Sequence, residues 1–443
     1  MKPFFFWVTM STAWVAGPLA AQTTGMSAPA NGISAPARAV SPMPVPVTLS
    51  EVLEAARQNL DVRMAQQDVA ATRADILAAN HVPLPVLSAK AASADQVGFA
   101  NGALTSQRRI DKSVGVDWTW ERGGKRALRT QAAQNNAAAS QADLAEIMVL
   151  QQLMAKDAFY DLLAAQERLM HVQAMAQSAA LLAATAQKRM NAGDLSAQDF
   201  ARVEIEAQRA QSDVQSAQLD RQRAAVALSQ ITGRQLRPQN VNEWRLQADW
   251  PANAAPLGGN PQAWLDGRAD VQAATLRMAA AQAILDNAQA LKTIDPTLGL
   301  SLDPQANASN RLVELRLQFP LQVGYAYEGE IGRALAQRAQ AQEQLDKIRL
   351  AAQSEWTGLQ QDLSNAADRL KAYEQQILPR ARKVAEQAEL AYTKGAIPLV
   401  DLLDARRTLR ASLLEALNVQ TEFAKAATAW QLRSLPVAVV ANP

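Results

Sequence analysis

One long stretch of the chain contains no helix-breaking residue. From Lys125 to Asn191 there is neither proline nor glycine, and alanine, glutamine, leucine and arginine are abundant. These residue types favour helix, so the stretch predicts a single unbroken α-helix. At 1.5 Å per residue that helix would be roughly 100 Å long. A compact globular domain cannot contain such a helix, so the chain must build a coiled coil, a tube or a spacer.

Further helices are predicted around this one by the spacing of proline and glycine. A second helix is expected over Ser196–Ile231. The second half of the chain repeats the plan, with a long helical pattern over Glu328–Lys394 and another over Pro398–Leu435. Pro379 lies inside the first of these patterns, where it lacks a backbone N–H and should kink the helix.

The chain contains an internal repeat. Gly193-Asp194-Leu195 stands before Asp199 with the spacing at which Gly395-Ala396-Ile397 stands before Asp401, a shift of about 202 residues. Upstream, Leu60-Asp61-Val62 resembles Ala269-Asp270-Val271. We interpret residues 48–232 and 261–435 as two copies of one unit, joined by a connector over 233–260 that carries tryptophan and proline.

Each repeat also contains candidate strands in which apolar and polar residues alternate. They cover Ser113–Trp120, Leu298–Asp303 and Val313–Leu321, with a weaker partner over Leu84–Ala91. Such strands of 8 to 10 residues suit either a soluble hairpin packed on helices or a membrane barrel. The neighbouring long helices leave little for a soluble hairpin to pack on, which favours the membrane. Four strands cannot close a barrel, so several copies of the chain would have to share one.

The N-terminus has the pattern of a secretory signal peptide. Lys2 precedes an apolar run that ends in the small residues before Gln22, so residues 1–21 are expected to be removed. A buried helix is the alternative, but residues 22–47 are rich in proline and alanine and are expected to be an extended tether. No other apolar run is long enough for a transmembrane helix, so a membrane would have to be crossed by strands. Residues 436–443 are a C-terminal tail.

Composition excludes several functional classes. The 44 basic and 42 acidic residues give a net charge of +2, which argues against a nucleic-acid partner. The chain has no cysteine, so thiolate chemistry and cysteine-bound zinc are excluded. His81 and His171 are far apart and have no ligand pattern around them. Gly123-Gly124-Lys125 is better explained as a tight turn than as part of a phosphate loop. We therefore expect no catalytic residue, no cofactor and no resident metal, and the protein is not expected to be an enzyme.

The order helix, strand, strand, long helix, tight turn, helix occurs in both repeats. It comes with the turns Met190–Ser196 and Tyr392–Pro398, the segment Ile377-Leu378-Pro379 and the junction Trp120–Arg126. Over about Thr48–Leu435 this arrangement resembles the outer membrane efflux protein (TolC) family. The resemblance implies a mainly α fold with a small β part. Three chains would form a homotrimer with a 12-stranded barrel in outer-membrane lipid and a long-helix tube in the periplasm.

The resemblance also implies partners and a channel aperture. The partners would be a periplasmic adaptor protein and an inner-membrane pump, and the turn at Gly123-Gly124-Lys125-Arg126 is similar to the heavy-metal branch, whose pumps are of the resistance-nodulation-division type. Three residues apart, Asp401 and Asp404 share a helix face next to the second tip turn and would form acidic rings at the aperture. A helix-dipole role for the two acids is the alternative interpretation.

Relatives can lock the closed tip through a tyrosine, an arginine and an aspartate. Tyr392 matches the tyrosine, but Ile397 stands where the arginine is expected, so the lock cannot be present unchanged. Lys394, Arg406 and Arg407 are candidate substitutes. In the first repeat, Gly193 and Asp199 form the corresponding tip turn, as Gly395 does in the second.

The predicted function is passive export through the outer membrane, with heavy-metal cations as the first candidate cargo. Drugs or other small molecules are the second candidate, and a type I protein secretion duct is the third. A periplasmic coiled-coil adaptor or scaffold is a competing interpretation from another class. It fits less well, because such adaptors have β-rich flanking domains that this sequence lacks.

Overall fold

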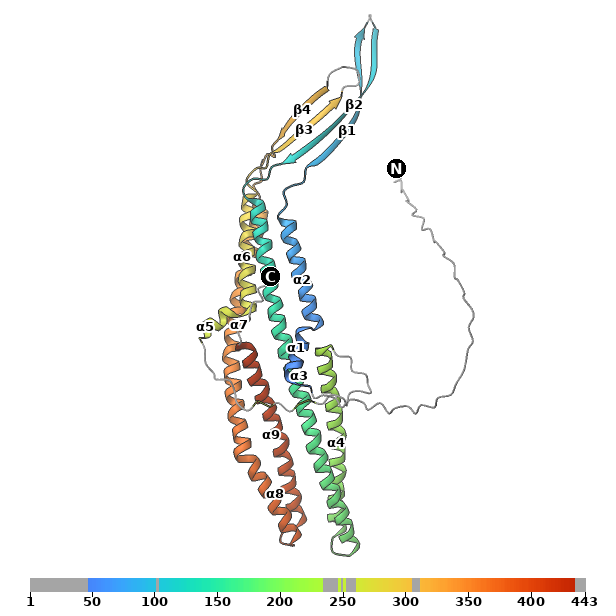
Figure 1. The fold of residues 1–443 in the computed structure, drawn as a ribbon, viewed down its shortest axis with the longest axis vertical. Helices are drawn as coiled ribbons and strands as arrows, with labels where there is room; N and C mark the ends of the chain where they lie inside the picture. The colour runs from blue at the N-terminus through green and yellow to red at the C-terminus, as the bar shows by residue number, and fades with distance from the viewer. Residues whose placement is uncertain are drawn as a thin grey trace, which may run out of the picture. The chain divides into compact units, whose positions relative to one another are not determined.

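The computed structural model describes residues 47–100, 103–233, 246, 247, 250, 251, 260–304 and 311–434 (Figure 1). The predicted signal peptide, nearly all of the tether, most of the connector and the C-terminal tail lie outside these residues. The described part is mainly helical and carries one antiparallel sheet, which confirms the predicted fold class at this level.

The helices follow the doubled order expected from the repeat. The first half contains α1 (Leu49–Arg57), α2 (Leu60–Ala79), α3 (Lys125–Asn191) and α4 (Ala197–Thr232). The second half contains α5 (Pro261–Gly267), α6 (Ala269–Ala290), α7 (Glu328–Ala372), α8 (Leu378–Thr393) and α9 (Leu399–Ser434). Helix α3 has the predicted bounds, because Gly124 and Gly193 on either side adopt positive φ angles of 70° and 83° that end the helical conformation.

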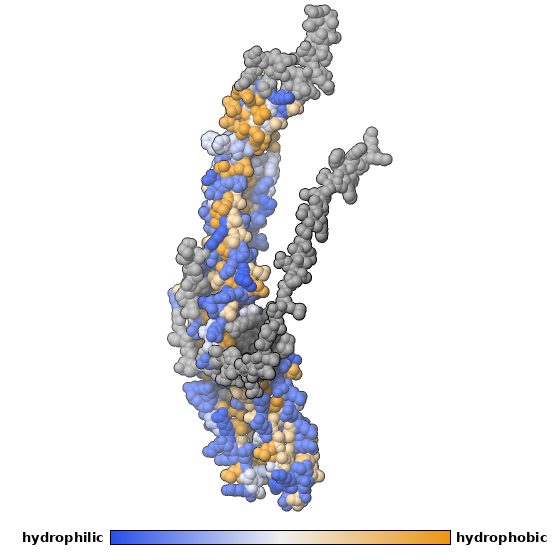
Figure 2. Space-filling view, turned by 45° about the vertical axis from the view of Figure 1, so that its right-hand side comes forward, coloured by the Kyte–Doolittle hydropathy of each residue, from blue (hydrophilic) through white to orange (hydrophobic). Residues whose placement is uncertain are grey.

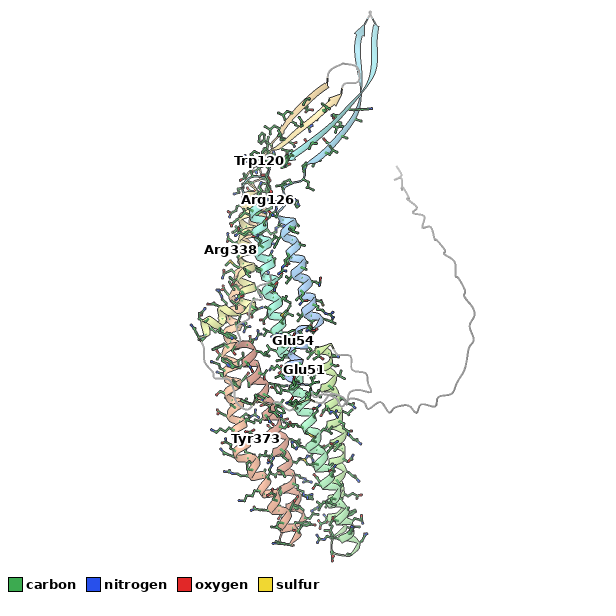
Figure 3. All side chains as sticks on the ribbon, in the orientation of Figure 1. Glu51, Glu54, Trp120, Arg126, Arg338 and Tyr373 are labelled. Carbon is green, nitrogen blue, oxygen red and sulfur yellow. The ribbon has the colours of Figure 1, made fainter. Side chains whose placement is uncertain are left out.

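The long helix of the second half is interrupted near Pro379. The interruption is a π-helical turn over Tyr373–Ile377 between α7 and α8, and Tyr373 is labelled in Figure 3. The α-helix resumes at Leu378, so Pro379 occupies the second helical position, where no intrahelical partner is needed for its missing N–H. The chain therefore accommodates this proline by a wider turn, which the sequence pattern predicted only as a kink.

The sheet joins the two repeats. Its strands are β1 (Val86–Ala100), β2 (Ala103–Thr119), β3 (Thr297–Pro304) and β4 (Arg311–Gln318), paired in that order and all antiparallel. The first two strands have 15 and 17 residues, so the predicted length of 8 to 10 residues is wrong for them. Alanine, serine and charged residues between positions 90 and 113 break the alternation from which strand length was predicted.

One face of the sheet is apolar and exposed. The register pairs Val116 with Leu300 and Leu300 with Leu315, so side chains of the same kind stand side by side across three strands. Those three side chains are 44%, 56% and 71% exposed. Figure 2 shows hydrophobic residues gathered over this part of the molecule. An apolar face of this kind marks a surface that contacts lipid or another protein.

The opposite face is polar and closely packed. A Cβ atom on Gly115 would come within 2.9 Å of the Ser301 Cβ, and one on Gly299 would lie 2.3 Å from the Asp117 Oδ1. The close approach of the two strands therefore favours glycine at position 115, whereas a side chain at position 299 would first have to displace the Asp117 carboxylate. Ser301 Oγ donates a hydrogen bond of 3.2 Å to Glu314 on this face.

The helices form two connected rows that share α3. Next to the sheet the contacts run from α2 to α3, then α6, then α7 (Figure 1). Toward the other end they run from α4 to α3, then α9, which packs against α7 and α8. Among the described helices, α2 and α4 have a neighbour on one side only, and so does the α7–α8 helix at the opposite end of each row. Each row therefore has two open edges, one from each repeat.

A buried lysine fixes the junction between sheet and helices. Lys125 Nζ donates to Thr293 O and to Asp295 Oδ2, both at 2.7 Å, and its side chain is only 6% exposed. The Arg122 N–H donates to the second carboxylate oxygen of Asp295 at 2.8 Å. Figure 3 labels Trp120 and Arg126, which border this turn. The motif singled out in the sequence thus ties the turn from β2 to α3 of the first repeat to the turn from α6 to β3 of the second.

We expect Lys125→Met to loosen this junction. The substitution keeps the apolar stem but removes the donor to Thr293 O and one of the two donors to Asp295, at a cost of about 1–3 kcal/mol. Amide hydrogen exchange at the start of α3 should become faster by a factor of about 10 to 100. Arg126→Met, one residue further along and more exposed, is the matched control and should leave exchange nearly unchanged. Equal exchange in both variants would contradict the role given to Lys125.

Candidate channel aperture at the helical tips

The two helical hairpins end in turns of the same geometry. In the first, the Asp194 N–H donates to Arg189 O at 2.9 Å, and in the second the Ala396 N–H donates to Ala391 O at 2.8 Å. Gly193 and Gly395 occupy the left-handed position of each turn, with φ angles of 83° and 71°. This is the helix-ending arrangement that glycine favours after the last helical residue.

The acidic residues after the two turns differ in their surroundings. Asp199 begins α4 within a cap, because its N–H donates to Ser196 Oγ at 3.0 Å and the same hydroxyl donates to its carboxylate at 2.8 Å. In the second repeat Pro398 stands at the position of Ser196 and supplies no hydroxyl. Asp401 and Asp404 are exposed and have no hydrogen-bond or ion-pair partner among the described residues.

The helix dipole explains these two acids only in part. Asp401 is in the first turn of α9, where a carboxylate stabilises the positive end of the helix. Asp404 is almost one turn further on, and the dipole effect falls off within the first turn. The dipole alternative therefore accounts for Asp401 but gives no reason for a second free carboxylate on the same face.

A small apolar cluster joins the two hairpins at the tips. It combines Ala186 and Val203 of the first hairpin with three leucines of α9, and all five side chains are buried: Ala186, Val203, Leu399, Leu402 and Leu403. Tyr392 packs against this cluster. The tips are therefore held together within one chain by a contact much smaller than the cores near the middle of α3.

Polar contacts supplement this cluster and identify a residue that sequence reasoning missed. Arg189 Nη1 donates to the Tyr392 hydroxyl at 3.1 Å, and its guanidinium lies 5.6 Å from the centre of the Tyr392 ring. Within the chain Arg406 pairs with Glu389 at 2.8 Å and Arg407 with Glu206 at 3.0 Å. The arginine beside Tyr392 in the described chain is thus Arg189 of the other hairpin. A role of Lys394, Arg406 or Arg407 in a lock of the closed tip stays a prediction.

The contact between Arg189 and Tyr392 should stabilise the state in which the tips of the two hairpins are packed together, called the paired state here. Tyr392→Phe removes the hydrogen bond and keeps the ring, a change worth about 0.5–1.5 kcal/mol. In planar bilayers we expect the open probability to rise by a factor of about 2 to 10. Arg189→Gln should have a similar effect, and the double variant should add little to either single change. Tyr325→Phe, at the sheet end of the helices, is the control, and additive effects at the tip would show that the two residues act separately.

The described residues contain neither a membrane-spanning helix nor a cluster of metal ligands. None of the described helices is long and apolar enough to cross a membrane. Among the described residues there is also no group of three or more histidine, aspartate or glutamate side chains that could hold a metal ion. His81 Nδ1 lies 2.8 Å from Val82 O in an exposed turn, far from His171 on α3.

Comparison with known proteins identifies the class to which this fold belongs. The family model described as "Outer membrane efflux protein" matches residues 52–234 and 260–433, which include both repeats. The chain belongs to the outer membrane efflux protein family. Its function is that of an outer-membrane efflux channel, and its family and fold are those of channels rather than of enzymes.

Individual relatives agree with this assignment. The chain is 25% identical to the cobalt-zinc-cadmium resistance protein CzcC of Cupriavidus metallidurans over 86% of its own length and 88% of that protein. The outer membrane protein VceC of Vibrio cholerae has the same fold, with a TM-score of 0.72, 19% identity and coverage of 87% of this chain and 95% of VceC. CusC gives a TM-score of 0.69 at 18% identity, with 88% and 93% covered.

Proposed function

We propose that three copies of this chain close into a ring. Every layer of the described structure has one open edge from each repeat: α2 or α4 opposite the α7–α8 helix, and β1 opposite β4. Because the two edges are different surfaces, a copy can bind the next copy head to tail, and a closed ring satisfies every edge. Three chains would supply twelve strands, enough for a membrane barrel whose lipid-facing side is the apolar face containing Val116, Leu300 and Leu315.

The two repeats then form a continuous wall. In this proposal residues 48–232 and 261–435 alternate around a periplasmic helical tube, the connector 233–260 surrounds its middle, and residues 1–21 are the cleaved signal peptide. Residues 22–47 are the tether and residues 436–443 the tail. The barrel lies in outer-membrane lipid, and the tips point toward a periplasmic adaptor and an inner-membrane pump of the resistance-nodulation-division type.

The aperture of the channel is proposed at the second tip turn. Asp401 and Asp404 are free carboxylates beside the second tip turn, and three copies would place them in rings. A narrow acidic ring attracts cations and repels anions. Tyr392, held by Arg189 of the first hairpin, would keep the tips paired in the closed state.

Heavy-metal cations are the proposed cargo. The observation that carries this choice is the similarity to the cobalt-zinc-cadmium resistance protein over nearly the whole chain. A cation-attracting aperture and the junction Gly123-Gly124-Lys125-Arg126 agree with it. Drug or small-molecule export would use the same architecture, as would type I protein secretion, and each remains a candidate that the cargo test separates from the first.

The cargo is tested by deleting the gene and measuring growth. We expect the deletion strain to become several-fold more sensitive to zinc, cobalt or cadmium and to regain resistance when the gene is restored. Sensitivity to dyes and antibiotics alone would overturn the metal assignment while leaving the channel function intact. Outer-membrane fractionation with high-salt washing is a separate test, because a soluble coiled-coil scaffold would be released and a channel would stay.

A further inference from the structure

One face of α2 is exposed along the whole helix although its residues have the spacing of a coiled-coil seam. Successive positions on this face are four and three residues apart in turn, which places them on one side of a helix. From the sheet end they are Ala78, Ala74, Ala71, Gln67, Met64 and Leu60, and all six are exposed. The buried residues Val62, Ala65 and Val69 face α3 on the other side, so the seam is open in the described chain.

A second open face with the same spacing lies on α7, at the opposite edge of the row. From the sheet end its positions are Gly332, Ala336, Ala339, Glu343, Asp346 and Leu350, and again all six are exposed. The buried residues Leu345 and Ala352 pack on α6, on the other side of the helix. Each edge of the row therefore carries one six-position face without a neighbour among the described helices.

The two faces match position by position when they are brought together. Helix α2 runs toward the sheet and α7 runs away from it, so side by side they are antiparallel. Counted from the sheet ends of the two helices, each α7 position lies three residues further on than its α2 partner, a uniform shift of roughly 4.5 Å. The pairs are Ala78–Gly332, Ala74–Ala336, Ala71–Ala339, Gln67–Glu343, Met64–Asp346 and Leu60–Leu350. Small residues thus meet small ones near the sheet, and leucine meets leucine at the far end.

Charged residues beside the seam favour the same alignment. At intervals of seven residues, one flank of α2 carries Asp61, Asp68 and Asp75, and one flank of α7 carries Arg333, Gln340 and Lys347. In an antiparallel pair these flanks lie on the same side of the contact, with Asp75 beside Arg333 and Asp61 beside Lys347. Asp61 already accepts a hydrogen bond from Gln151 at 2.9 Å, whereas Asp75, Arg333 and Lys347 are exposed and have no hydrogen bond or ion pair among the described residues. Opposite charges at such positions set the partner and the orientation of a coiled coil.

We propose that α2 of one copy and α7 of the next form an antiparallel coiled coil over these six pairs. This inference rests on the ring proposed above and names the surfaces that join it, residues 60–78 of one copy and 332–350 of its neighbour. The two faces are different and lie on opposite edges, so copies associate head to tail. Two α2 helices would bring their aspartates together, which disfavours the alternative contact between like edges.

The first test uses the absence of cysteine from the chain. Leu60→Cys and Leu350→Cys are introduced together into the full-length protein, which is oxidised in isolated outer membranes and separated on a denaturing gel. A disulfide requires Cα atoms about 4.4–6.8 Å apart. We expect at least ten-fold more covalent oligomer than from Leu60→Cys with Glu343→Cys, whose second cysteine is roughly 10 Å out of register. Each single variant should remain monomeric on the gel.

A charge exchange tests the flank, with the mass of the purified protein measured by light scattering. Asp75→Arg should lower the trimer fraction in detergent at least five-fold, because two arginines would then face each other. Arg333→Asp added to it should restore that fraction to within two-fold of the unmodified protein. A trimer that lacks this rescue, or in which the matched cysteine pair links no better than the out-of-register pair, would overturn the coiled coil and leave the ring standing. A monomeric unmodified protein would overturn both.

Discussion

Replacing Asp401 and Asp404 together by alanine should raise the single-channel conductance and reduce the preference of the channel for cations. The proposed rings bring three copies of each carboxylate close together at the narrowest point. Alanine removes both the charge and most of the side-chain volume, so ions meet a wider and less selective opening. The measurement is single-channel conductance and reversal potential of the purified protein in planar bilayers, under a salt gradient.

Two control variants separate the effect of the carboxylate charge from the effects of side-chain size and of position in the tip. Asn at both positions keeps the volume, so cation preference should fall with little gain in conductance. Asp199→Asn removes a carboxylate at the equivalent position of the first repeat while its N–H still donates to Ser196, and it should leave selectivity unchanged. The selectivity should also weaken as salt is raised, because the screening length falls from about 10 Å at 0.1 M to about 3 Å at 1 M. Unchanged conductance in the alanine variant would remove the aperture assignment.

The second large effect is expected from a buried ion network on α9. Arg433 Nη1 donates to both carboxylate oxygens of Glu146, at 2.8 and 3.0 Å, and the two side chains are 8% and 15% exposed. Arg433 Nε lies 2.9 Å from Glu355 Oε1, although it is not aligned for a hydrogen bond. Glu355 in turn pairs with Arg268, so the network joins α3, α7 and α9 to the residue that precedes α6.

Arg433→Met should therefore destabilise this region by about 3–5 kcal/mol, because Glu146 would stay buried without its partner. Hydrogen exchange at the C-terminal end of α9 should become at least about 100-fold faster. Glu146→Gln added to Arg433→Met should restore much of the protection. Arg369→Met is the matched control, since Arg369 pairs with Glu415 and Glu422 on the surface, and it should cost under about 1 kcal/mol.

The destabilisation caused by Arg433→Met should become smaller at lower pH. Burial already raises the pKa of Glu146, although the charge and hydrogen bonds of Arg433 oppose the shift. Removing Arg433 would raise that pKa further. An acid whose pKa is higher in the folded state than in the unfolded state favours folding at low pH and loses that contribution as pH rises through the folded pKa. The difference in exchange between Arg433→Met and the unmodified protein should hence shrink as pH falls from 7 toward 5. A constant difference would mean that Glu146 is not the destabilising group.

Much of the helical framework could be predicted because glycine and proline mark its ends. The bounds of α3 follow from Gly124 and Gly193, and the repeat placed the matching turn at Gly395. The extra length of β1 and β2 could not be predicted, because apolar and polar residues do not alternate in that part of either strand. Ala92, for example, pairs with Asp111. The π-helical turn before Pro379 was missed for a similar reason, since several local geometries can accommodate the same proline.

Contacts between distant residues explain what was missed at the tip. Arg189 and Tyr392 are 203 residues apart, and nothing in either local sequence marks them as partners. Glu146 and Arg433 are 287 residues apart. A glutamate or an arginine in a helical segment is usually exposed to solvent, so neither local sequence indicates a buried ion pair. Asp401 and Asp404 were identified from sequence because their spacing and their place after a repeated turn are local features.

The different surroundings of Asp199 and Asp401 have a consequence for the tolerance of each tip to mutation. Asp199 is bonded to the Ser196 hydroxyl, whereas proline stands at the corresponding position before Asp401. A substitution at position 401 or 404 therefore breaks no side-chain hydrogen bond among the described residues, whereas a substitution at position 199 weakens the cap of α4. Protein engineering can hence change the charge of the second tip while the start of α9 stays folded, and the first tip offers no equal freedom.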